Sequence, residues 1–533
     1  MTASREDTHY RKEELSMKSP EEFRKSVYEK QTVKVAVRNR RRKQAMVCVP
    51  LAFLIVLGSV FLPRVWTGGN LPFLRSGKIP LMLQVASPAV PASIGLSEDQ
   101  TGLSEDQAAK VELLEKVLEE ATTEQEEEEA KKAIEEIEKE AAKERAKVEI
   151  DPAFSKSVNQ FARDSAVLLS KDFAENACYS PLSMYYALAL TGCGAGGQTK
   201  EEIQNILYAE DDWAAGQCGR YYSQHYHDDE TGTFRLENSL WLDGRYAFGD
   251  QFISYAENDF FSSLFQVDFS DPTLGDEMTK WVSEQTDGQL SPTFTFEDHQ
   301  MLYLLNTILY ETQWSNCFLE ENNTREDFHK ADGSVVTAEF MHQTEFARYY
   351  KKNGYTGASL PLRNGDRMVF VLPDEGVSTE ELLSDPALFE ELFFGGQPDE
   401  VSVVRWSIPK FDFTCEYDLQ NTLKDLGVNR AFDQVLADFS DMGKLEMYLS
   451  ETSQTIHIGV GENGISSKAP KYYSEISDCY GIKTEMVLDR PFLFAVLTGD
   501  VTWDGGNSET LLYVGVCGDP AASGQPGSAA AAS

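Results

Sequence analysis

The chain has 533 residues, 41% of them hydrophobic and 25% charged, and this length exceeds one ordinary compact core, so more than one region is expected. A formal net charge of -39 would repel nucleic acid along most of the surface and excludes it as a natural partner. The charge is uneven, because residues 1–44 carry 13 Lys and Arg against 7 Asp and Glu.

An uncharged apolar run, residues 45–62, follows this basic segment. At about 1.5 Å per residue it reaches roughly 27 Å, close to the hydrocarbon thickness of a bilayer. The basic cluster from Arg38 to Lys43 stands directly before the run and should stay cytoplasmic. The sequence therefore predicts a cytoplasmic tail at 1–44, a single-pass plasma-membrane signal anchor at 45–66, and an extracellular remainder. The alternative is a secreted protein with a cleaved signal peptide, whose charged region would be unusually long.

Two polar segments come next. Residues 67–104 are expected to form an irregular linker containing most of a tandem heptapeptide, GLSEDQT and GLSEDQA, at 95–108. Two copies are too few to build a repeat fold. Residues 105–150 are rich in Glu, Lys and Ala with one narrow apolar stripe, which predicts an acidic helical stalk. Disorder is the alternative for this stalk, and an acidic run at 124–129 argues against a long coiled coil.

The region 151–520 has a different character, because aromatic residues become frequent and strand and helix patterns alternate irregularly. Such a mixture favours an α+β domain. Strand patterns occupy residues 367–373, 403–417, 455–460 and 491–497, and helical patterns occupy residues 180–192 and 417–428. Residues 521–533 contain only Ala, Ser, Gly, Gln and Pro and are predicted to be a disordered tail.

Little in this domain suggests catalysis. The chain's eight cysteines, seven of them in this domain, are widely spaced, which indicates buried or free thiols rather than a disulfide framework or a metal site. Gly192, Gly194 and Gly197 match GxGxxG, but a helical pattern precedes them where a dinucleotide site needs a strand. The histidines of HYHDDE at 225–230 are expected in a solvated loop. With no GxSxG or HExxH motif, the sequence predicts no enzyme, no catalytic residues, no metal and no cofactor.

A series of short motifs runs through the domain in order. The series comprises NACYSPLSMYYALALTGCGAGGQTKEEI (176–203), ENSLWLD (237–243), WVSEQTDGQL (281–290), LLNTILYETQW (304–314), MVFVLP (368–373), PKFDF (409–413), LGVNRAFD (426–433), ADFS (437–440), DRPFLF (489–494) and LLYVGVCGDP (511–520). Each motif alone is modest, but their number and order resemble the serpin family, the serine protease inhibitor fold, over about residues 151–520.

The resemblance implies a serpin fold with three β-sheets and about nine helices, here preceded by the transmembrane helix and the stalk. It also implies a monomeric domain whose partner is a serine protease, or a cysteine protease. The protease cleaves an exposed reactive-centre loop near the C-terminus and forms an acyl-enzyme. The loop then inserts as a new central strand of the main sheet and distorts the bound protease before hydrolysis finishes, which releases stored strain.

The resemblance also assigns roles beneath the strands that must part. Ser180, Ser183, Asn306 and Gln454 match the family's shutter, and Trp314 matches the aromatic residue of the breach. Hydroxyls and amides can hold strands by hydrogen bonds yet exchange partners. The family usually has His at the position of Gln454, which also offers a donor and an acceptor. The structural alternatives are helix capping by Ser180 and core packing for Trp314.

The hinge of the bait loop departs from the family pattern. The matching hinge residues are Glu462, Gly464, Ile465, Ser466 and Ser467. Glu462 and Gly464 are kept, but Ile465 replaces the family's Thr, and the following run of small residues reads SSKAPK at 466–471.

The substituted residues bear on insertion. Inserted residues alternate between the two faces of the sheet, so Lys471 points inward if Ile465 does. A buried, unpaired ammonium is strongly unfavourable, and Pro470 removes a hydrogen bond from a central strand. Insertion is therefore expected to stall at about Ala469.

The scissile bond follows from two counts. The family spacing of about 14 residues forward from Gly464 reaches Asp478, and about 11 residues back from Pro491 reaches Tyr480. The candidates are Asp478, Cys479 and Tyr480. The predicted function is serine-type protease inhibition by suicide-substrate trapping. The alternatives are a non-inhibitory serpin-fold binding protein at the cell surface, prompted by Lys468, Pro470 and Lys471, and an adhesion module on a stalk.

Overall fold

A computed structural model describes residues 150–173, 175–229, 232–286, 288–296, 301–394, 401–444, 446–466, 484–499 and 509–522, and the backbone of residues 79–87. These residues form nine α-helices and two β-sheets, which confirms the α+β prediction. The predicted anchor at 45–66 and tail at 521–533 lie wholly or almost wholly outside the described residues, as does the stalk. Within the described residues, no helix is both long and apolar enough to cross a bilayer.

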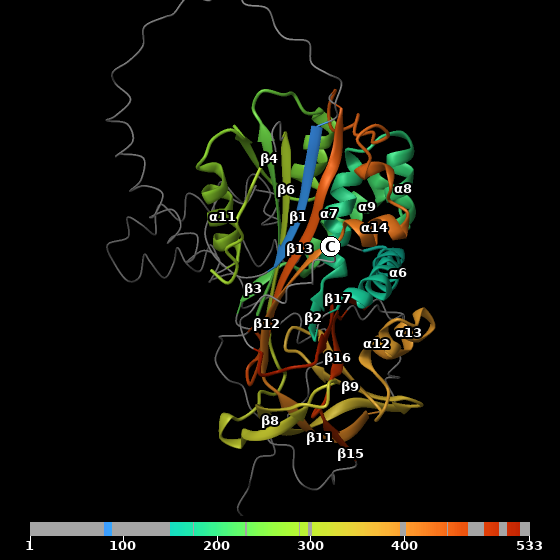
Figure 1. The fold of residues 1–533 in the computed structure, drawn as a ribbon, viewed down its shortest axis with the longest axis vertical. Helices are drawn as coiled ribbons and strands as arrows, with labels where there is room; N and C mark the ends of the chain where they lie inside the picture. Colours follow the sequence, from blue (N-terminus) through green and yellow to red (C-terminus); the bar gives the residue numbers. More distant parts are fainter. Residues whose placement is uncertain are drawn as a thin grey trace, which may run out of the picture.

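The larger part of the protein is organised around an eight-stranded sheet (Figure 1). Its strands are β1 (Ile79–Ser87), β3 (His227–Asp229), β4 (Gly232–Asp243), β5 (Ser263–Val267), β6 (Leu302–Gln313), β12 (Phe411–Asp418), β13 (Met447–Gly461) and β14 (Gly464–Ile465). β12 pairs with β13, and β4 pairs with β6. β1 and the short β14 both lie between β13 and β6.

The second sheet has nine strands. They are β2 (Asn176–Tyr179), β7 (Thr324–His329), β8 (Val335–Lys352), β9 (Tyr355–Pro361), β10 (Arg367–Pro373), β11 (Val401–Pro409), β15 (Thr484–Val487), β16 (Phe492–Thr498) and β17 (Thr510–Cys517). The prediction of three sheets is wrong for the described residues. The long β8 pairs with β7 and β11 along its first part and with β9 along its last five residues, so two groups of strands merge into one sheet.

The described residues contain nine α-helices, several of which pack against the eight-stranded sheet. They are α6 (Pro152–Leu169), α7 (Pro181–Cys193), α8 (Gly197–Leu207), α9 (Asp211–His225), α10 (Asp250–Asn258), α11 (Leu274–Gln285), α12 (Thr379–Leu383), α13 (Pro386–Phe394) and α14 (Gln420–Leu426). Alternation along β6 explains the two faces, because Leu304 joins the main core while Tyr303 and Leu305 join a second core with α11. In Figure 1, α7 and α11 accordingly lie on opposite sides of this sheet.

Helix α7 is buried along its whole length and is the central helix of the fold. Ser180 caps it by accepting a hydrogen bond from the backbone N–H of Ser183, and Pro181 occupies the first helical position, where its missing N–H is harmless. The capping alternative for Ser180 is therefore confirmed. A helix buried on all sides is held in place by its neighbours, so it can provide a rigid support for the strands that pack on it.

Most predicted elements of the domain are found, with three local differences. The alternating segment 403–417 is two strands, since the chain passes from one sheet to the other between Pro409 and Phe411. The predicted helix 417–428 is shorter, because its first residues belong to β12. The solvated loop predicted for HYHDDE is wrong: His225 ends α9 and stacks on Tyr221 with ring centroids 4.0 Å apart, and the rest includes β3.

Two further findings concern the sequence patterns. Six cysteines, Cys178, Cys193, Cys218, Cys317, Cys415 and Cys517, are free and buried, which confirms the thiol prediction for the described residues. The irregular linker predicted for residues 67–104 contains a strand, β1, which the composition of the whole segment concealed. Its nine uncharged residues, IPLMLQVAS, are a strand-length apolar run whose significance becomes visible only beside the sheet it joins.

Candidate functional site at the centre of the eight-stranded sheet

The first part of the site joins α7 to β6. The Ser183 hydroxyl donates to the side-chain oxygen of Asn306 at 2.5 Å, and the Asn306 amide donates to the side-chain oxygen of Asn238 on β4 at 2.7 Å. Asn238 in turn donates to the carbonyl of Phe260 at 3.0 Å. Ser183 and Asn306 are completely buried, so each broken bond would leave a polar atom away from water. This series of hydrogen bonds therefore fixes β6 to α7.

The second part joins the same helix end to β13. The Gln454 side chain accepts from the backbone N–H of Ser180 at 3.0 Å and donates to the Ser180 carbonyl at 3.0 Å. The Ser180 hydroxyl donates to the Leu512 carbonyl on β17 at 2.8 Å. Gln454 thus uses both its donor and its acceptor. The four residues matched to the shutter lie together at the N-terminus of α7, two strands being tied to one helix.

The hinge follows β13. Gly464 and Ile465 form β14, which pairs antiparallel with Val460 and Gly461 on one side and with Thr312 and Gln313 on the other. Ile465 is 1% exposed and therefore points into the core. A short piece of the hinge thus already lies between the two central strands.

Backbone geometry sets where this piece begins and ends. Gly464 has a φ of +143°, and a Cβ at this position would lie 1.9 Å from the carbonyl oxygen of Thr312, so only glycine fits. Ser466 has a φ of +47°, a left-handed conformation that does not continue a strand. Its N–H donates to the Gly459 carbonyl at 2.7 Å.

Charge pairing holds the turn between β13 and β14. The Glu462 carboxylate accepts from Lys410 at 3.0 Å and from the Asn323 amide at 2.6 Å, and its side chain is 13% exposed. Burial by itself would raise the pKa of Glu462, but hydrogen bonds from its own backbone, Lys410 and Asn323 outweigh burial and hold the pKa below its ordinary value. Glu462 is therefore an ionised anchor for the hinge.

Trp314 fastens the same turn from the end of β6. Its indole N–H donates to the Gly461 carbonyl at 2.9 Å, and its backbone N–H donates to the Asn463 carbonyl at 3.0 Å. The ring is 1% exposed and contacts Phe318 edge-on, with centroids 5.9 Å apart. Core packing and strand fastening are both present at this residue.

Some predicted site residues lie outside the described residues, and some residues of the site were not predicted from the sequence. Ser467 and the scissile-bond candidates Asp478, Cys479 and Tyr480 lie outside the described residues. Sequence reasoning did not single out Asn238, Asn323 or Lys410, the partners of Asn306 and Glu462. Asn238 and Lys410 stand inside quoted motifs, ENSLWLD and PKFDF, but their pairing depends on strands distant in sequence.

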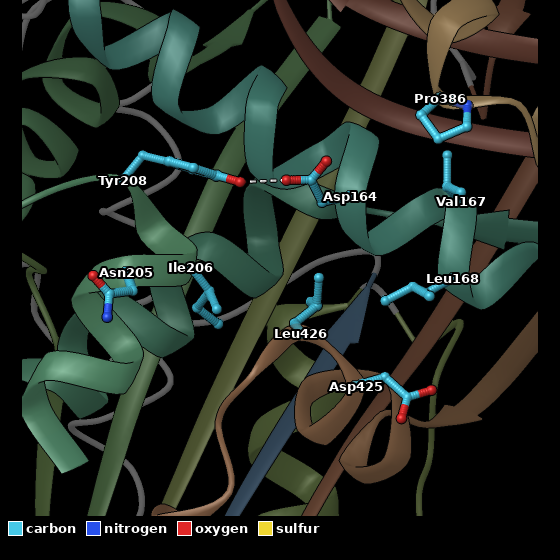
Figure 2. Close-up of a pocket in the computed structure, with 9 residues that line it drawn as sticks. All are labelled: Asp164, Val167, Leu168, Asn205, Ile206, Tyr208, Pro386, Asp425 and Leu426. Carbon is cyan, nitrogen blue, oxygen red and sulfur yellow. Dashed lines mark hydrogen bonds between the residues drawn. The ribbon is translucent and has the colours of Figure 1, made fainter. Parts of the chain in front are cut away.

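A separate surface cavity of about 370 Å³ lies where α6, α8 and α14 meet, with Pro386 at its rim (Figure 2). Its apolar lining comes from Val167, Leu168, Ile206 and Leu426. The Tyr208 hydroxyl donates to Asp164 across it, and desolvation, followed by that carboxylate, raises the pKa of Tyr208 to about 12. Asn205 and Asp425 also line the cavity, so its lining is mixed apolar and polar.

Comparison with known proteins identifies relatives of this chain. A family model described as "Serpin (serine protease inhibitor)" matches residues 156–503. Human Serpin B11 is 26% identical over 384 residues, covering 66% of this chain and 95% of its own. An uncharacterized serpin-like protein of Thermococcus kodakarensis is 28% identical over 376 residues, covering 67% and 84%. The solved structure of a thermophilic serpin, tengpin, in its native state has a TM-score of 0.60 at 24% identity, covering 70% of this chain and 95% of its own.

Proposed function

The chain belongs to the serpin family, and on this premise we propose that it inhibits a serine protease, or a cysteine protease, by suicide-substrate trapping. The protease would cleave the segment after Ser466 and be held as its acyl-enzyme while the loop enters the eight-stranded sheet. The chain itself would act as inhibitor and not as a catalyst.

One observation supports this proposal most directly. β14 lies between β13 and β6, so the first residues of the loop are already paired with the two strands between which the rest of the loop would insert. The pairs of β14 run antiparallel to both neighbours, which is the direction in which the following residues would continue. The side chains that hold β6 and β13 to α7 use hydroxyls and amides, which exchange partners without leaving a charge unpaired.

The test is to incubate the full-length protein with chymotrypsin-like proteases, elastase-like proteases and proteases that cleave after acidic residues. Trapping yields a covalent complex that survives denaturant, and Ile465→Arg, which would place an unpaired charge in the core, should convert the protein into a plain substrate. Ile465→Val is the matched control and should keep the complex. Clean cleavage by every protease, with no complex at any ratio in wild type and in Leu83→Pro/Val85→Pro, which disrupts the β1 strand between β13 and β6, would defeat the proposal.

For the cellular setting we propose a single-pass plasma-membrane protein with a monomeric serpin domain outside the cell. The support is sequence alone, namely the basic cluster Arg38 to Lys43 directly before the apolar run 45–62. Protease added to intact cells should release the domain. A domain that resists shaving until the membrane is opened would overturn this orientation, and soluble domain in the medium would favour secretion.

A second candidate function is non-inhibitory binding. Two observations favour it: Lys468, Pro470 and Lys471 are poorly suited to a buried central strand, and the cavity beside Tyr208 and Asp164 offers a place for a small ligand. Cleavage of the loop without a complex, together with unchanged heat stability of the cleaved protein in both wild type and Leu83→Pro/Val85→Pro, would select this alternative.

A further inference from the structure

A strand from outside the serpin domain fills the centre of the main sheet. β1 pairs with β13 along its whole length and with β6 from Leu81 to Ala86, so its backbone has neighbours on both sides. Figure 1 shows it, in blue, between β6 and β13. It runs parallel to both, whereas β14 runs antiparallel to both. β1 also precedes the family match, which begins at residue 156.

β1 passes directly over the shutter. Val85 lies in register with Gln454 on β13 and with Asn306 on β6. These are the two side chains that tie their strands to Ser180 and Ser183 at the start of α7. With β1 in place, the two central strands are held apart at the level where the loop would have to pass.

The register of the hinge shows which loop residues compete for this position. In the antiparallel pairing of β14 with β13, the two residue numbers of each pair add up to 925, for example 460 and 465. Continued in this register, residue 469 would meet Ile456 and residue 478 would meet Met447. Those are the partners of the two ends of β1, Ser87 and Ile79. The loop can therefore reach about residue 468 before it meets β1.

Composition favours β1 over the loop at this position. Residues 79–87 carry no charge, and their one proline, Pro80, lies where β1 pairs with β13 alone, because pairing with β6 begins at Leu81. The competing loop residues 469–478 include Pro470, Lys471, Glu475 and Asp478. A central strand loses a ladder hydrogen bond at an internal proline and disfavours unpaired charges on a buried face.

From these observations we propose that Ile79–Ser87 is a gate strand, which occupies the sheet position required by the cleaved loop and stops insertion at about residue 468 until it leaves. The proposal rests on the proposed function, since the gate matters only if the loop is to insert. It assigns a regulatory role to the segment that joins the predicted anchor to the domain. Release of this segment, rather than loop cleavage alone, would then make the domain competent to trap.

The first test measures occupancy in the full-length protein by hydrogen exchange. The amides of residues 82–86 should exchange several-fold more slowly than an unstructured peptide in wild type. In the double variant Leu83→Pro/Val85→Pro they should lose this protection, because proline removes two ladder donors. Ser93→Pro, outside the strand, is the control and should leave protection unchanged. Exchange of wild-type residues 82–86 at the rate of an unstructured peptide would overturn the gate.

The second test measures blocking and separates the gate from the proposed function. After loop cleavage, wild type and Ser93→Pro should gain little heat stability, whereas Leu83→Pro/Val85→Pro should gain several degrees. Adding a synthetic peptide of residues 79–87 before cleavage should cancel that gain. An equal gain in all three proteins would refute blocking, and so would no gain in the double variant. A gain in the double variant without any covalent complex would defeat protease trapping and leave the gate standing.

Discussion

At the scale of single residues, the centre of the sheet depends on a few buried polar side chains that hydrogen-bond to one another and to the N-terminal end of α7. Asn306 connects Ser183 with Asn238, and Gln454 uses both of its polar atoms on Ser180. Buried groups of this kind add modestly to stability when paired and subtract strongly when a partner is removed. Their loss should therefore be measurable even in a large domain.

We predict that Asn306→Ala destabilises the native state by about 1–3 kcal/mol, because the Ser183 hydroxyl and the Asn238 amide oxygen lose their partner in a fully buried site. Thermal melting of the full-length protein checks this. The control is Asn258→Ala, which removes an exposed amide that donates to the Ser254 hydroxyl, and it should change the midpoint little. An unchanged midpoint for Asn306→Ala would count against the shutter assignment.

The hinge anchor should depend on pH. The folded-state pKa of Glu462 lies below its ordinary value of 4.5, so its charge contributes stability above that pH, and this contribution is lost as pH falls through the folded-state value. Glu462→Gln should therefore lower the melting temperature at pH 7, by the equivalent of roughly 1–3 kcal/mol for weakened charge-assisted hydrogen bonds. The difference from wild type should shrink below pH 4.5. Glu375→Gln, at an exposed position, is the control, and a pH-independent difference would contradict the assignment.

At the scale of elements, two short strands of different origin share one gap. β14 enters between Val460 and Thr312, and β1 ends opposite Ile456 and Thr307. The stretch of β6 between them, Ile308 to Glu311, is the room left for further loop residues. If β1 acts as the proposed gate strand, entry of the hinge and exclusion of the remaining loop are separate properties, carried by different segments of the chain.

Two glycines near the hinge should differ in their tolerance of alanine. Gly464→Ala should expel β14 from the sheet, because its Cβ would lie 1.9 Å from the Thr312 carbonyl at a φ of +143°. Gly461→Ala meets nothing within 4 Å and should be tolerated. The expected result is a lower melting temperature and less covalent complex for Gly464→Ala only. Equal behaviour of the two variants would show that β14 does not contribute to the hinge.

At the scale of the whole molecule, the described residues stop at Ser466 and resume at Thr484, on either side of the proposed reactive-centre loop. Ser466 leaves the eight-stranded sheet, and Thr484 begins β15 at the edge of the nine-stranded sheet. The segment from 467 to 483 therefore joins the two sheets along the chain, and it contains the proposed scissile bond.

We predict that proteolysis of this segment falls within residues 477–481, after Asp478 or Tyr480, with Tyr480 suited to a protease that has a large apolar pocket. Mass spectrometry of the released C-terminal fragment locates the cut. Cuts spread from Lys468 to Lys483 according to each protease's preference would instead indicate a merely accessible connection. Oxidation of Cys479 should alter recognition, so the experiment needs a reduced sample as its comparison.

The sequence by itself determined the family, the α+β class and most strands and helices of the domain, because period-two and helical patterns and ordered motifs are local properties. It also indicated that Gln454 could replace a histidine, since donor and acceptor capacity belong to the side chain. Only the tertiary structure decided that Glu462 meets Lys410 and Asn323, that β8 merges two sheets, and that residues 79–87 enter the gap above Asn306. These outcomes depend on which strands become neighbours, and strand pairing between distant segments leaves no periodic signal in either segment.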